Sequence, residues 1–239
     1  MHTPSEKLNP REISVLLRGE SETISAWSEG WNARRFALHL AGIVFGAGCY
    51  GAAMGWWRSP EQALFVAIKF PLIILLTTLG NALINAMLAP LPGLNIPFRK
   101  SFSAILMSCT IAAAVLGAFS PLLAFMVWNA PAMSAQAVSL PAYNLIKLAH
   151  VAAITFAGTL GNARLFQLLV RLGGSRAVAF RVLFAWLAGN LFLGSQLSWI
   201  LRPFIGVPTL PVEFFRTGAL HGNFYENVFG SLLHVFQAD

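Results

Sequence analysis

Four asparagines stand out among the residues that could do chemistry, because each lies inside an otherwise apolar stretch. They are Asn81, Asn85, Asn162 and Asn190. An amide that loses contact with water needs another hydrogen-bond partner, so we expect these side chains to face neighbouring helices. Two interpretations follow. The amides either fix the packing through interhelical hydrogen bonds, which is the commoner use of this residue type, or they line a polar path.

Three cations form a second candidate set, at the opposite ends of the apolar stretches from these asparagines. They are Lys69, Lys147 and Arg202, with Glu213 as a candidate ion-pair partner. Charge within hydrocarbon costs several kcal/mol unless it pairs or reaches the surface. The set predicts either a cationic ring that holds an anionic lipid headgroup or three side chains that each extend to the polar boundary.

Residues for catalysis or metal binding are few. His39 and His150 lie in apolar stretches, and Ser195 lacks the Gly-x-Ser-x-Gly setting of a hydrolase nucleophile. No Asp or Glu interrupts the apolar stretches, and Cys49 and Cys109 have no metal-ligand spacing. We therefore assign no catalytic residue, no metal site and no cofactor, and we favour a protein that is not an enzyme.

The surrounding composition indicates a membrane protein. Hydrophobic residues make up 56% of the 239 residues, and charged residues only 10%. A stretch of about 20 apolar residues matches the thickness of a bilayer core. Although the net charge is +7, the Lys and Arg residues are scattered, so we expect no nucleic-acid partner. Five spans are predicted, at 36–57, 64–88, 102–128, 143–169 and 178–201.

The predicted fold is all-α, a polytopic transmembrane bundle of about five spans with amphipathic interfacial helices at both ends. Residues 1–35 form a cytoplasmic or interfacial segment, residues 36–204 the bundle, and residues 205–239 an external Pro-rich loop and amphipathic tail. Arg34, Arg35, Arg99 and Lys100 flank alternate loops, so the positive-inside rule predicts a cytoplasmic N-terminus and an external C-terminus. We expect a bacterial inner (plasma) membrane.

A pentapeptide occurs twice, as Thr78-Leu79-Gly80-Asn81-Ala82 and Thr159-Leu160-Gly161-Asn162-Ala163. Each copy lies in an even-numbered span and is followed by a basic loop and another span. This pattern predicts a duplicated two-span unit over 64–130 and 143–205, with the two units parallel.

Small residues are concentrated in the first span. Two small-xxx-small patterns there are typical of close helix contact, within the chain or in a homo-oligomer. Their glycines are Gly42, Gly46, Gly51 and Gly55.

Five spans, an amphipathic N-terminal segment and a short external tail resemble the Yip1-type membrane family, in architecture over 36–204. The resemblance implies a non-enzymatic protein of membrane organisation or trafficking. Our first hypothesis is therefore a non-enzymatic membrane protein that acts through lipid or protein-partner contacts, as an organiser or a complex subunit. The alternatives are a small transporter or channel with a polar path near Asn81 and Asn162, and an enzyme that acts on a lipid phosphate at the outer face.

Overall fold

The computed structural model describes residues 33–88, 97–133, 140–206 and 209–227. Within these residues the fold is all-helical, and each long helix is long and apolar enough to cross a membrane. The predicted all-α bundle of five spans is therefore confirmed, and the chain is an integral membrane protein. The helices are α3 (Ala33–Trp56), α4 (Pro60–Leu88), α5 (Phe98–Trp128), α6 (Leu140–Gly173) and α7 (Arg176–Leu201).

The helices extend slightly beyond the predicted spans. Helix α5 begins at Phe98 rather than Phe102, so that Arg99 and Lys100 belong to its first turn. Composition detects the hydrocarbon-facing part of a helix, whereas the helix itself continues into the headgroup layer. Pro71 and Pro121 lie inside α4 and α5. Neighbouring helices can satisfy the backbone groups that a proline frees in a membrane, so neither residue ends its helix.

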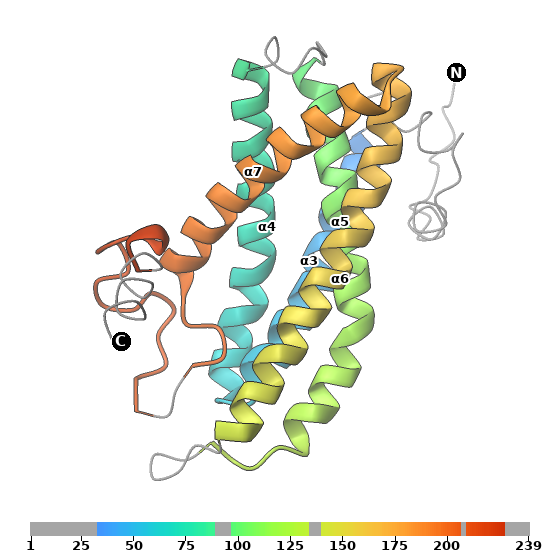
Figure 1. Ribbon diagram of the computed structural model, residues 1–239. Coiled ribbons are helices and arrows are strands. Elements are labelled where there is room, and N and C mark those ends of the chain that lie inside the picture. Colours follow the sequence, from blue (N-terminus) through green and yellow to red (C-terminus); the bar gives the residue numbers. More distant parts are fainter. Residues whose placement is uncertain (1–32, 89–96, 134–139, 207–208, 228–239) are drawn as a thin grey trace, which may run out of the picture.

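The helices alternate in direction along the chain (Figure 1). The turn between α3 and α4, the end of α5 and the start of α6 lie together, at what we call the Arg58 end. The start of α3, the end of α4, the start of α5 and the turn between α6 and α7 lie at the opposite end, which we call the Arg99 end. Helix α7 crosses the others obliquely from the Arg99 end and stops beside α4.

Helix α3 packs against both α4 and α5, and contacts also join α4 to α5, α5 to α6, α6 to α7 and α7 to α4. The last four helices therefore form a closed ring, with α3 outside it. In the two copies of the repeated pentapeptide, Gly80 lies against Leu193 of α7 and Gly161 against Ser108 of α5. Each contact joins the first helix of one predicted unit to the second helix of the other. The duplication stays a prediction.

The small residues of α3 lie at two different helix contacts. A Cβ on Gly46 would meet the backbone of Ala113 in α5, whereas a Cβ on Gly51 would lie 2.5 Å from the carbonyl oxygen of Val66 in α4. Gly55 lies equally close to α4, with 2.6 Å between its Cβ position and the carbonyl oxygen of Gln62. Gly42 is half-buried. These glycines thus let α3 approach both α4 and α5 within one chain.

Large apolar side chains also cover the outer surface of the bundle. Phe45 is 76% exposed, and Phe184 and Leu191 are exposed to a similar degree. A soluble monomer rarely exposes apolar surface over such a wide area. In a membrane these side chains face lipid, so their exposure carries no hydrophobic penalty.

The chain after α7 folds back against the bundle as a compact segment without long helices. We call residues 202–227, described apart from 207–208, the C-terminal lobe. It lies beside α4 and under the end of α7 (Figure 1). A short helical turn begins at Phe224, within the segment 205–239 that was predicted to contain the amphipathic tail. The rest of that tail and the predicted N-terminal interfacial helix lie outside the described residues.

Candidate functional site

Polar side chains of α4 hold the C-terminal lobe in place. The Gln62 side chain is buried, and its Nε2 donates hydrogen bonds of 2.9 Å and 3.0 Å to the carbonyl oxygens of Pro203 and Phe204. A guanidinium nitrogen of Arg58 donates to the carbonyl oxygen of Leu210 over 3.1 Å. Backbone carbonyls that leave a helix need such donors when water is excluded. The lobe is therefore attached to the turn between α3 and α4, through Arg58, and to the first turn of α4, through Gln62.

Lys69 lies deeper on the same face of α4 and is fully buried. Its Nζ donates long hydrogen bonds of 3.5 Å and 3.4 Å to the carbonyl oxygens of Pro203 and Glu213. The ammonium group also lies 5.1 Å from the ring centroid of Phe214. Carbonyl dipoles and an aromatic face together stabilise a cation in a dry setting. The lobe thus supplies the surroundings that let α4 carry this charge.

On the α7 side, an aromatic side chain and a hydroxyl complete the attachment. The ring of Tyr225 stacks on Phe192, with 5.5 Å between centroids, and its hydroxyl lies 2.7 Å from Oγ of Ser195. The Ser195 hydroxyl also bonds to the carbonyl oxygen of Leu191. Ser195 therefore has a structural use and is not near His150, which bonds through Nδ1 to the hydroxyl of Tyr50 over 2.9 Å.

Replacing Gln62 by methionine should loosen the lobe. The change keeps the side-chain length but leaves the carbonyl oxygen of Phe204 without this donor, at a cost of about 1–3 kcal/mol, and the carbonyl oxygen of Pro203 with only the long bond from Lys69. We expect tryptic cleavage after Arg216 to become about tenfold faster, because cleavage of a transiently opened segment follows its opening free energy. The exposed Gln167 on α6, replaced in the same way, is the control. Equal cleavage rates in both variants would contradict the role of Gln62.

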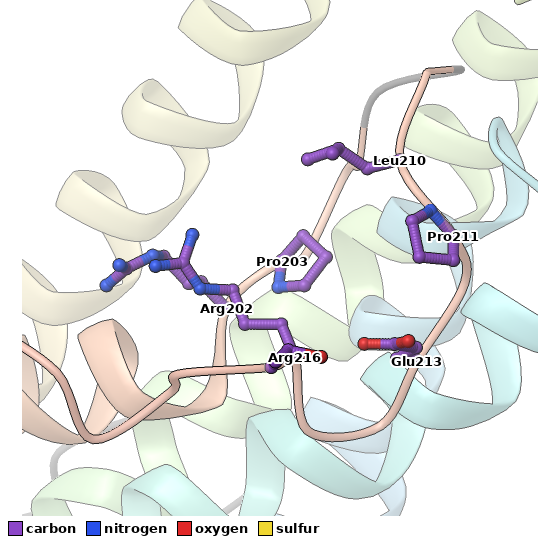
Figure 2. A pocket seen from close by; sticks show the side chains of 7 residues that line it. Arg202, Pro203, Leu210, Pro211, Glu213 and Arg216 are labelled. Atoms are coloured by element: carbon purple, nitrogen blue, oxygen red, sulfur yellow. The ribbon is translucent and has the colours of Figure 1, made fainter.

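A pocket of about 300 Å³ opens within the C-terminal lobe, just after the end of α7 (Figure 2). Its walls combine apolar side chains with two cations, one acid and a hydroxyl. They are Arg202, Pro203, Leu210, Pro211, Glu213, Arg216 and Thr217. The guanidinium groups of Arg202 and Arg216 point to the same side of the pocket (Figure 2).

The two arginines are held close together although their charges repel. Arg202 stacks on the indole of Trp199, 3.0 Å from the ring centroid, and donates to the carbonyl oxygen of Trp199 over 2.9 Å. Burial and the positive charge of Arg216 lower the pKa of Arg202. The Nε atom of Arg216 is buried and has no acceptor among the described residues. Two neighbouring guanidinium groups, one of them held by Trp199 and the other with an unused donor, suit an oxyanion, which would remove the repulsion and accept the hydrogen bond.

The predicted cationic ring is only partly assembled. The Lys69 ammonium bonds to the carbonyl oxygen of Pro203, next in the chain to Arg202, but Lys69 is buried beneath the lobe and does not line the pocket, whereas the Arg202 guanidinium lies on Trp199. Lys147 is exposed on α6, where its Nζ lies 5.9 Å from the ring centroid of Tyr143. It does not reach the pocket. Glu213 contributes its backbone carbonyl to Lys69, rather than the carboxylate that the sequence suggested.

Asn81, in the first copy of the pentapeptide, forms hydrogen bonds to another helix. The amide nitrogen of Asn81 donates to the carbonyl oxygen of Trp186 over 3.0 Å and to Oδ1 of Asn190 over 2.9 Å. Asn85 donates to Oδ1 of Asn81 over 3.3 Å. The two bonds that Asn81 donates join α4 to α7, so this amide fixes the packing of the two helices. Asn162 is half-buried.

Sequence reasoning missed three residues of the pocket region, namely Gln62, Trp199 and Arg216. Gln62 and Trp199 belong to helix ends, where a polar or aromatic residue is ordinary. Arg216 lies in a segment without periodicity, so no pattern assigns it a direction. The one available signal is the excess of arginine after the last span, which runs against the charge rule used for orientation.

These features define an all-α, polytopic integral membrane protein with a lobe folded on one end of its bundle. Comparison of the chain with protein-family models, with curated proteins and with solved structures found no match.

Proposed function

We propose that this chain is a non-enzymatic integral membrane protein that acts through contact between its C-terminal lobe and a phospholipid. The observation that carries the proposal is the pair of guanidinium groups, Arg202 and Arg216, which lie on the same side of one pocket. A phosphate diester is the oxyanion that a membrane offers to such a pair, and guanidinium groups bind phosphate in two-pronged geometry.

The distribution of charge supports an orientation for the proposal. Arg34, Arg35, Arg99 and Lys100 lie at the Arg99 end, which we assign to the cytoplasm by the positive-inside rule. The C-terminal lobe then lies in the outer headgroup layer, and a bacterial inner membrane is the expected setting. The Yip1-type resemblance agrees with a protein of membrane organisation and is proposed on architecture alone.

The test compares the thermal stability of delipidated protein with and without added phospholipid. We expect lipid to raise the melting temperature by about 5 °C, because a ligand that binds only the folded state stabilises it by mass action. The double variant Arg202→Gln, Arg216→Gln should lose this increase. Lys147→Gln, which removes an exposed cation outside the pocket, should keep it.

Two results would overturn the proposal. An equal increase in the double variant would place the lipid contact elsewhere. Conversion of the added lipid by the wild-type protein would favour the alternative of an enzyme that acts on a lipid phosphate. A second copy of this chain or another membrane protein is the remaining class of partner, and it predicts a lipid-independent complex in mild detergent.

A further inference from the structure

The pocket holds charges of both signs, and they are kept apart. Figure 2 shows the carboxylate of Glu213 on the other side of Pro203 from the two guanidinium groups. All three charged side chains line the same space. The Glu213 backbone is fixed by the hydrogen bond from Lys69 to its carbonyl oxygen, so the carboxylate has a defined starting point.

A ligand that fits this arrangement carries a negative and a positive group on one short chain. We propose that the pocket binds the phosphoethanolamine headgroup of a membrane lipid, with the phosphate on Arg202 and Arg216 and the primary ammonium on Glu213. This inference rests on the proposed function, since it takes the pocket to be the phospholipid site. It adds the headgroup class and a residue that selects it.

Comparison with other lipid headgroups shows why Glu213 would select a primary ammonium. A primary ammonium has N–H donors that a carboxylate accepts, as in a lysine–glutamate pair. A choline headgroup has no N–H to donate, and a glycerol headgroup has no positive charge. With either of these, the Glu213 carboxylate would be desolvated by the ligand without a charged partner, which is unfavourable. Leu210, Pro203 and Pro211 provide an apolar wall for the glycerol backbone of the lipid.

Native mass spectrometry of the full-length protein tests the inference directly. The protein in detergent is offered phosphatidylethanolamine, phosphatidylcholine and phosphatidylglycerol with identical acyl chains. We expect the wild type to retain phosphatidylethanolamine about tenfold more tightly than the other two, as one charge-assisted hydrogen bond allows. Glu213→Gln should abolish that preference, and Glu213→Asp should keep part of it.

Glu61→Gln is the matched control, because Glu61 is an exposed acid in the first turn of α4 and does not line the pocket. It should leave the preference unchanged. A melting curve for each variant shows whether it is folded. Competition by soluble phosphoethanolamine separates the sources of the headgroup: displacement of lipid indicates that a free solute can also serve, and resistance indicates a membrane lipid alone.

Failure of the headgroup inference can be distinguished from failure of the proposed function. Wild-type binding of all three lipids with equal affinity, lost in the double arginine variant, would overturn the headgroup inference and leave the proposed function standing. Unchanged selectivity in Glu213→Gln would do the same. Absence of lipid binding in the wild type would overturn both.

Discussion

We expect Gly46→Ala to lower the free energy of unfolding by about 3 kcal/mol, because one methyl group is enough to separate two helices. The added Cβ would overlap the backbone carbonyl of Ala113, and Gly117, one turn further along α5, also faces Gly46, with its own Cβ position 2.9 Å from the Gly46 Cα. Backbone atoms cannot rotate away as a flexible side chain can. Either α3 or α5 must move, and every apolar contact along their interface weakens.

Gly158→Ala is the matched control for that substitution. Gly158 lies in the middle of α6, and no atom lies within 4 Å of its Cβ position. The same change there should be neutral or stabilise the helix by up to about 1 kcal/mol, since alanine has the higher helix propensity. Unfolding of both variants in detergent, followed by circular dichroism, provides the comparison. Similar stabilities for the two variants would contradict the close α3–α5 contact.

Asn81→Leu should also cost about 3 kcal/mol. The substitution removes the hydrogen bonds to Trp186 and Asn190 and leaves the amide of Asn85 without its acceptor. The branched side chain would also meet Gly189, because the Asn81 side chain already occupies the space where a Cβ on Gly189 would lie. Overpacking therefore adds to the lost bonds.

Asn162→Leu makes the same change in the second pentapeptide copy. Asn162 is half-buried, and we expect its replacement to alter stability by less than about 1 kcal/mol. Unfolding measurements in detergent distinguish the two variants. Equal losses at both positions would show that the copies carry equivalent amide contacts. Flux in liposomes that disappears in both variants while the folded state persists would support the transport alternative instead.

The spans were predictable because apolar length and flanking charge are properties of single segments. Five stretches without an acid required five membrane-spanning helices, and Pro90 and Pro131 lie just beyond the ends of two of them. The glycines of α3 were predictable as contact residues, since small side chains at four-residue spacing share one face. The sequence did not indicate which helix each glycine contacts. Gly46 faces α5 and Gly51 faces α4 because of the turn of the helix between them.

The pocket was not predictable, since it depends on how an irregular segment returns to the bundle. Lys69 and Arg202 were singled out for charge near a span end; Lys69 bonds to the carbonyl oxygen of Pro203, and Arg202 lines the pocket. Lys147 has the same sequence character but faces outward. Arg216 became relevant only through its position beside Arg202. Side-chain type indicated which residues needed partners, and tertiary contacts alone decided which partners they have.

The partners of Lys69 have a consequence for biogenesis. Ribosomal synthesis delivers α4 long before residues 203 and 213, whose carbonyl oxygens receive the ammonium in the finished protein. During that interval the charge must remain hydrated at the lipid boundary, with its long stem extended along the helix. Helix α4 can therefore reach its final position only once residues in the last quarter of the polypeptide have been synthesised. A nascent chain truncated after α7 should remain a preferred substrate for membrane quality control.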